Sequence, residues 1–213
     1  MTGLGERSHL VDGKVNLATH VRDIVNVVKW ESLNDIVLVG HSYGGIIISG
    51  VAEEMREAIG SIVFLDAFVP ENGDSLAAKA SQPVREAISA AVDKGETVMK
   101  PVSAAVFRVN ETDRGWVDAM CTPHPLATFT DKITITGARE RIAKKAYIRA
   151  KGYPSVPFDG VQERLKGRRR VARLRVALRP RRHGRHAGSS DGGSRRGRIA
   201  ALLRARNERT RPK

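Results

Sequence analysis

The sequence predicts an α/β fold in which a parallel sheet is flanked by helices. Two short apolar runs, 36–40 and 61–66, have the length and β-branched composition of strands that are buried on both faces. Residues with helical periodicity precede and follow the first run, and this alternation indicates a doubly wound parallel sheet. A third strand is expected at 145–150.

The remaining elements are predicted from periodicity and from turn residues. Residues 2–9 are expected to form a loop, and Asn16 can cap a helix over 17–30 that has apolar side chains on one face. A helix from 46 to about 58 follows the first strand. Residues 71–144 have helical periodicity interrupted by prolines, and we interpret them as a cap inserted between strands. Residues 152–159 are expected to form a loop that leads into a helix from 161.

The net charge of +14 is distributed very unevenly along the chain. Residues 164–213 contain 19 Lys and Arg and only two acids, whereas residues 1–163 contain 18 basic and 21 acidic residues. From Arg168 onward there are 16 arginines and no aromatic residue, a composition that is not expected to build a packed core. The chain therefore divides into a folded part, 1–166, and an Arg-rich low-complexity tail, 167–213, which is expected to be disordered.

The cellular location is predicted from the cysteine content and from the apolar stretches. Cys121 is the single cysteine, so there is no disulfide framework, and a reducing compartment is the default expectation. The N-terminus has no signal-like segment, and no apolar stretch has the length needed to span a membrane. These observations predict a cytoplasmic protein without a membrane partner, and they leave the oligomeric state open.

The pattern Gly40-His41-Ser42-Tyr43-Gly44 lies between the first strand and the next helix. G-x-S-x-G in this context is typical of a nucleophile elbow, a tight turn that strains the serine backbone and lifts its hydroxyl above the sheet edge. Gly40 and Gly44 are expected to avoid collisions with the neighbouring strand and helix. The alternative is a glycine-rich turn with a serine there by chance. The flanking strand and helix favour the elbow.

Five segments occur in one order: GLGER (3–7), VLVGHSYGG (37–45), LDAFVP (65–70), TPHPLATF (122–129) and YIRA (147–150). Together they resemble the α/β-hydrolase superfamily, in particular the bacterial esterase branch related to plant hydroxynitrile lyases and methyl-salicylate esterases. The resemblance spans 2–166. It implies a partial α/β-hydrolase fold and a serine hydrolase that acts on small carboxylic esters through a Ser-His-Asp mechanism, without a metal or organic cofactor.

The resemblance also implies roles for individual residues. Ser42 matches the nucleophile, and the amide of Tyr43 matches one half of the oxyanion hole. Two carboxylates compete for the acid, and we prefer Asp66, at the end of the second strand, to Asp159. Without that role, Asp66 would be an ordinary strand-end aspartate that accepts loop amides.

The histidines offer no clear catalytic base. His41 is expected to pack within the motif, His20 to lie at the surface or core edge, and His9 and His124 to lie in loops. The family's closing Gly-His-Asp segment has no counterpart in frame. Under one permitted choice of codons, however, a one-base shift over 179–188 converts the Arg-rich segment into Gly-His-Asp-Val-Met. We therefore expect a frame-shifted C-terminus and assign the base to neither His183 nor His186.

The beginning of the chain departs from the family in a similar way. The family's early strands and its His-Gly oxyanion loop have no counterpart before Thr2, which predicts an N-terminally truncated domain. Since loss of the base costs about 10⁶ in kcat, the activity of this chain is expected to be impaired.

Two alternatives to an esterase stay open at this point. The first is a protein that binds nucleic acid through its basic tail, and the second is a catalytically inert remnant. The tail lacks the interleaved aromatic residues that stack on bases, so no specific nucleic-acid binding is expected. The identity of the small-molecule substrate, and esterase versus lyase chemistry, are not indicated.

Overall fold

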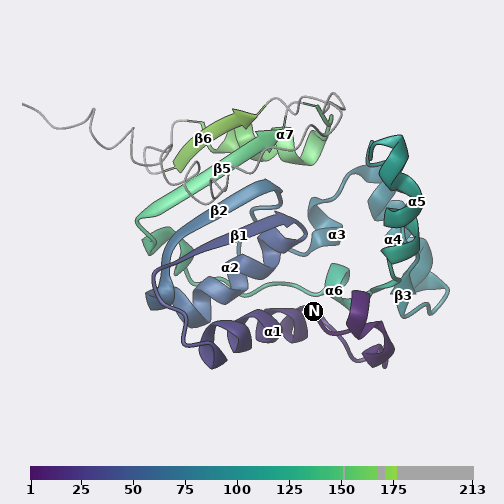
Figure 1. Cartoon of the computed structure of the whole chain (residues 1–213), viewed down its shortest axis with the longest axis horizontal. Coiled ribbons are helices and arrows are strands. Elements are labelled where there is room, and N and C mark those ends of the chain that lie inside the picture. The colour runs from purple at the N-terminus through teal and green to yellow at the C-terminus, as the bar shows by residue number, and fades with distance from the viewer. Residues whose placement is uncertain (151, 167–170, 177–213) are drawn as a thin grey trace, which may run out of the picture. The chain divides into compact units, whose positions relative to one another are not determined.

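The computed structural model describes residues 1–150, 152–166 and 171–176 (Figure 1). Strands β1 (Ile36–Ser42), β2 (Ile59–Ala67), β5 (Lys144–Ala150) and β6 (Val171–Val176) form a sheet in the order β1-β2-β5-β6. All neighbouring strands of this sheet are parallel, so their carboxyl ends meet at one edge. The predicted α/β fold with a parallel sheet is confirmed.

One face of the sheet packs against helices α2 (Gly44–Met55) and α7 (Val156–Arg164), which lie behind the strands in Figure 1. Ile48 and Ala52 of α2 and Val161 of α7 form one core cluster with sheet residues that include Phe64 and Tyr147. Helix α1 (Leu17–Trp30) packs on the outer side of α2. These contacts fix the start of α2 against the carboxyl end of β1.

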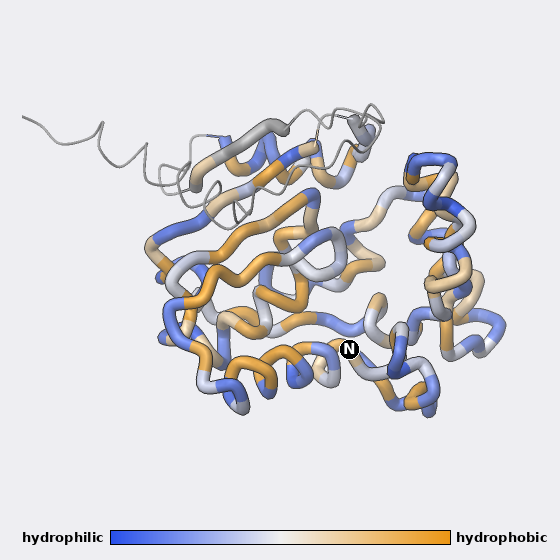
Figure 2. Tube along the Cα trace, viewed as in Figure 1, coloured by the Kyte–Doolittle hydropathy of each residue, from blue (hydrophilic) through white to orange (hydrophobic). Residues whose placement is uncertain are grey.

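On the opposite face of the sheet, β1 exposes apolar side chains in the described part of the chain. Val37 and Val39 of β1 are 56% and 53% exposed. Figure 2 shows that the residues of β1 and β2 are largely hydrophobic. In parallel pairs the partners share a face, so Val63, which pairs with Val39, belongs to the same surface.

The chain between β2 and β5 is mostly helical in its regular structure, and the interpretation of residues 71–144 as a cap stays a prediction. This segment contains α3 (Leu76–Lys79), α4 (Gln82–Asp93), α5 (Glu111–Met120), α6 (Ala127–Thr130) and the 3-10 turn η3 (Arg139–Arg141). Periodicity did not predict the short antiparallel pair of β3 (Val98–Met99) and β4 (His124–Pro125). This pair, with the bond from the Leu126 amide to the Thr97 carbonyl at 2.9 Å, fixes the position of His124.

The predicted N-terminal capping residue of helix α1 is confirmed. Asn16 Oδ1 accepts a hydrogen bond from the Thr19 amide at 3.0 Å, and Thr19 Oγ1 accepts one from the Asn16 amide at 3.3 Å. The two residues thus satisfy each other's free amides, as in a capping box.

We expect Asn16→Ala to lower the free energy of unfolding by about 1 kcal/mol, because it removes the acceptor for one end amide of α1. Urea denaturation followed by circular dichroism measures this change. Asn34→Ala, in the exposed turn after α1, is the matched control and should have a clearly smaller effect, since its side chain caps no helix. Equal effects of the two substitutions would contradict the capping role.

Three segments have a different kind of structure from the one predicted. Residues 5–10 form a 3-10 helix, η1 (Gly5–Leu10), where a loop was expected. Helix α7 begins at Val156, so residues 157–159 are helical, since Pro157 is well suited to a first helical turn. Strand β6 lies in the segment predicted to be a disordered tail. Its sequence alternates apolar residues with arginines, and this period of two was outweighed in the prediction by the arginine content.

Several predictions fall outside the described residues. His183, His186 and the Arg-rich segment 177–213 all belong to this part of the chain. Within the described ranges, no helix combines the length and the apolar character needed to cross a membrane.

Candidate active site

Ser42 is the last residue of β1 and has a left-handed backbone conformation, with φ of 51°. Tyr43 then returns to helical angles, and α2 begins at Gly44. A non-glycine residue with positive φ is strained, and such strain concentrates at functional sites. The strand–turn–helix geometry predicted for the elbow is therefore confirmed, whereas the role of Ser42 stays a prediction.

Of the two glycines expected to avoid collisions in the turn, the structure requires Gly40 but not Gly44. A Cβ on Gly40 would lie 2.5 Å from the Gly44 carbonyl oxygen, so Gly40 avoids a collision as predicted. A Cβ on Gly44 would meet nothing within 4 Å, so the expected collision there is wrong. The close approach is at Gly45, where a Cβ would lie 2.1 Å from the Phe68 carbonyl oxygen. Helix α2 leaves the turn with Gly45, and not Gly44, against the end of β2.

Asp66 lies beside Ser42 at the carboxyl edge of the sheet. His41 pairs with Leu65, but Ser42 pairs with Ala67, so Asp66 is an extra residue in β2. Its φ is 40°, and the amide of Phe68 donates to the Ser42 carbonyl at 3.2 Å. An extra residue of this kind redirects a side chain and is common next to active sites.

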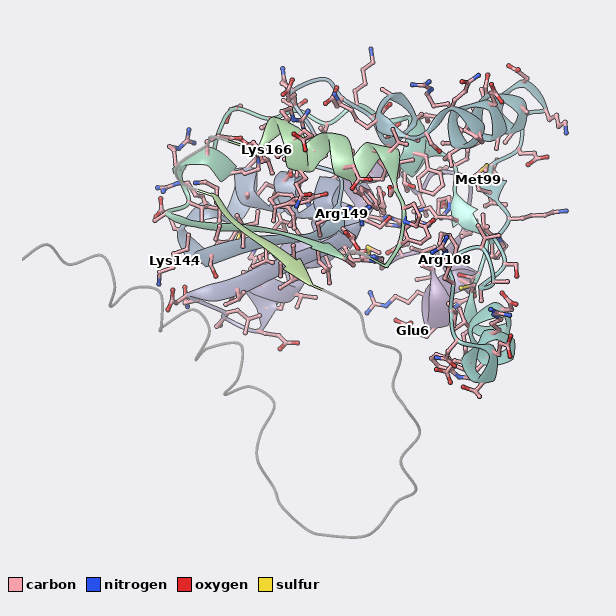
Figure 3. The ribbon with its side chains drawn as sticks, turned by 90° about the horizontal axis from the view of Figure 1, so that it is seen from above. Glu6, Met99, Arg108, Lys144, Arg149 and Lys166 are labelled. Carbon is pink, nitrogen blue, oxygen red and sulfur yellow. The ribbon has the colours of Figure 1, made fainter. Side chains whose placement is uncertain are left out.

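The Asp66 carboxylate is held by the end of β5. Its Oδ1 accepts hydrogen bonds from Arg149 Nη1 at 3.0 Å and from the Ala150 amide at 2.9 Å. Arg149 is itself buried and lies beside α7 (Figure 3). Burial by itself disfavours the charged guanidinium, but hydrogen bonds to Asp159 and Asp66 raise the pKa of Arg149 above its ordinary value.

Asp159, the alternative acid, binds the same guanidinium from the other side. It is the fourth residue of α7, its side chain is 59% exposed, and its Oδ1 accepts from Arg149 Nε at 2.8 Å. The structure thus brings the two carboxylates together through Arg149, a residue to which the sequence reasoning assigned no role. The available signal was an arginine inside the third predicted strand, since a charged side chain that a sheet buries needs partners.

Tyr43 supplies both a backbone amide and a buried ring at the elbow. Its amide donates to no carbonyl among the described residues, as is usual at the start of a helix. Its hydroxyl lies 3.1 Å from Nδ1 of His20, whose Nε2 is 2.8 Å from the Thr2 carbonyl oxygen. Burial raises the pKa of Tyr43. His20 is completely buried, so the predicted surface or core-edge position is wrong: its two ring nitrogens are satisfied inside the fold.

His124 of β4 packs against Tyr43, His20 and Phe129, and these four rings form an aromatic cluster. Its ring is stacked on Phe129 with centroids 4.3 Å apart and meets the edge of Tyr43 at 5.2 Å. Its Nε2 is buried without a hydrogen-bond partner in the described residues. Burial, with a smaller contribution from His20, lowers the pKa of His124 to about 4. The imidazole is therefore neutral at physiological pH.

The remaining histidines of the described part are His41, which directly precedes Ser42 in the chain, and His9. His41 is exposed, so the packing role predicted for it is wrong: the pleat turns it away from the face that packs on α2. His9 lies in η1. The Ser42 hydroxyl makes no hydrogen bond to any histidine in the described ranges. A metal site would need a group of at least three His, Cys, Asp or Glu side chains. The described residues contain no such group.

The sequence profile of the alpha/beta hydrolase family matches residues 2–201. The chain belongs to this family. A carbendazim-hydrolyzing esterase from Nocardioides sp. (strain SG-4G) is 40% identical over 166 residues, which cover 74% of this chain and 69% of the esterase. By family, the protein is a carboxylic ester hydrolase, and the predicted relation to esterases of this superfamily is confirmed.

Solved structures show the same fold. An extracellular α/β-hydrolase from a Paenibacillus species, related to tobacco salicylic acid binding protein 2, has a TM-score of 0.69 and 21% identity. The similarity covers 83% of this chain and 75% of that one. A methylesterase from Arabidopsis has a TM-score of 0.59 and 17% identity, over 97% of this chain and 84% of that one. At these identities the likeness concerns the fold of the α/β hydrolase.

Proposed function

We propose that this α/β hydrolase cleaves small carboxylic esters through covalent catalysis by Ser42. The observation that carries the proposal is the left-handed φ of 51° at Ser42, between the parallel strand β1 and the start of α2. This conformation is incompatible with a regular strand or helix at that residue. It is the conformation that a nucleophile elbow requires.

In this mechanism the Ser42 oxygen attacks the ester carbonyl carbon, and its proton passes to a general base. The carbonyl oxygen becomes an oxyanion, which the Tyr43 amide stabilises together with the positive end of the α2 dipole. Collapse of the tetrahedral intermediate releases the alcohol, which takes the proton, and leaves an acyl group on Ser42. Water then hydrolyses the acyl-enzyme and regenerates the serine.

Asp66 is the proposed acid, which would orient the imidazole and stabilise its cation. Its position beside Ser42 supports this role, as does its Oδ2, which accepts no hydrogen bond from the described residues. Asp159 is the weaker candidate for the acid, because its side chain is exposed on α7 and its contact is with Arg149. We further propose that turnover by this chain is slow, because no described histidine hydrogen-bonds to Ser42. The class of substrate, small carboxylic esters, and a cytoplasmic location stay predictions.

The proposal is tested with p-nitrophenyl acetate, by following p-nitrophenol release and by peptide mass spectrometry of the enzyme. We expect an acetyl group to accumulate slowly on Ser42, because both its formation and its hydrolysis need the general base. The Ser42→Ala variant should show no acetylated peptide at this position and no more release than the buffer. Ser49→Ala, a serine on α2 outside the elbow, is the control for nonspecific acylation.

Two results would contradict the proposal separately. An unmodified Ser42 after prolonged incubation would show that the residue is not a nucleophile. Rapid, Ser42-dependent turnover would leave the nucleophile in place but show that the activity is not impaired.

A further inference from the structure

Arg149 is a buried cation in direct contact with the proposed acid. We propose that Arg149 is a positioning residue, which holds the Asp66 carboxylate in the orientation needed to act on an imidazole at Ser42. The proposal rests on the proposed function, because it takes Asp66 to be the acid of that reaction.

The first support is the way in which the carboxylate is held. Arg149 Nη1 and the Ala150 amide both donate to Oδ1, at 3.0 and 2.9 Å. Two donors on one oxygen, one of them a fixed backbone amide, restrict rotation of the carboxylate. Oδ2 is thereby the acceptor atom left without a partner in the described residues. In a serine hydrolase, this is the atom that would accept the imidazole N–H.

The second support is that the guanidinium does not depend on Asp66 for its own position. Its Nη1 also donates to the Ala150 carbonyl at 2.7 Å, its Nη2 to the Tyr153 carbonyl at 2.7 Å, and its Nε to Asp159 at 2.8 Å. The planar guanidinium, with its donors in fixed directions, is thus bound to the end of β5, the following loop and α7. It forms a rigid support on which Asp66 is placed.

The third support is the charge balance. The Asp66 side chain is nine-tenths buried, and a buried carboxylate is costly unless a cation or several donors accompany it. Asp159 is exposed and interacts with solvent, so the compensation by Arg149 matters most for Asp66. The contact with Arg149 therefore offsets the cost of burying the Asp66 carboxylate and also fixes the orientation of that carboxylate.

The experiment measures acetylation of Ser42 by p-nitrophenyl acetate in the full chain, with saturating imidazole in solution as a general base. Arg149→Met and Asp66→Asn are each expected to lower the Ser42-dependent kcat by about tenfold or more, with little change in KM. If Arg149 acts through Asp66, the double variant should be no slower than Asp66→Asn alone, because the two effects are not additive. Arg149→Lys should recover part of the rate, since it keeps the charge but not the fork of donors.

Arg139→Met is the matched control. Arg139 is also buried and also pairs with an acid, Glu140, but its other contact is Ser49, away from Asp66. The Ser42-dependent rate of the Arg139→Met variant should equal that of the parent. Circular dichroism checks the fold of each variant, and if Arg149→Met does not fold, Arg149→Lys with and without Asp66→Asn carries the test.

Three results would overturn the proposal: an unchanged rate in the Arg149 variants, a further fall in the double variant, or an equal fall in Arg139→Met. A fourth result has a different meaning. If Ser42→Ala releases p-nitrophenol as fast as the parent under these conditions, the proposed function itself fails, and the role of Arg149 fails with it.

Discussion

Gly45→Ala is expected to destabilise the protein by about 3 kcal/mol or more, enough to prevent folding of a marginal domain. The added Cβ would lie 2.1 Å from the Phe68 carbonyl oxygen and 3.0 Å from the Ala67 Cβ. Both neighbours belong to the end of β2 or follow it directly, and the Phe68 amide is bonded to Ser42. Neither can move away without distorting the elbow, because the obstacle is backbone and not the end of a flexible side chain.

The adjacent Gly44 provides a control of the same chemistry. A Cβ there would meet nothing within 4 Å, and its backbone is helical, so Gly44→Ala should be neutral or stabilise by up to about 1 kcal/mol. Both variants are compared with the parent by chemical denaturation, or by yield of folded protein if Gly45→Ala does not fold. Similar stabilities of the two variants would show that α2 is not seated against β2 as described.

The sequence was sufficient for the elements that depend on local pattern. The apolar run 36–40, the periodic residues of 17–30 and the capping residue Asn16 are local signals, and β1, α1 and its N-terminal cap followed from them. A strained backbone at Ser42 was expected from the G-x-S-x-G pattern, and the structure gives this strain as a positive φ.

The features that were missed depend on contacts between distant segments. Arg149 is separated from Asp66 by 83 residues, and the need for glycine at position 45 arises from Phe68. His20 was placed near the surface because a polar residue on a helix is usually exposed. Its burial depends on two partners, Tyr43 and Thr2, that lie elsewhere in the sequence. In each case, the determining partner becomes visible only once the chain is folded.

Acid is expected to destabilise the fold through His124. Because burial and the neighbouring His20 lower its pKa from 6.5 to about 4, the unfolded chain binds a proton more readily than the folded one between these values. The contribution of neutral His124 to the free energy of unfolding is therefore fully present above pH 6.5, and it is lost as the pH falls towards 4. The difference in pKa corresponds to about 3 kcal/mol. Burial also lowers the pKa of His20, so protonation of His20 in acid reduces the stability of the fold in the same direction.

His124→Phe separates this effect from the titration of carboxylates. Phenylalanine keeps an aromatic ring next to Tyr43 and Phe129 and removes both the ionisable group and the buried Nε2 that has no described partner. The free energy of unfolding is measured at pH 7.5 and pH 4.5 for the parent, for His124→Phe and for His9→Gln, a change in η1 outside the cluster. We expect the loss between the two pH values to be smaller by about 2.5 kcal/mol in His124→Phe and unchanged in His9→Gln. An equal loss in all three proteins would mean that His124 is solvated in the folded state, and the aromatic cluster around Tyr43 would then not be closed to water.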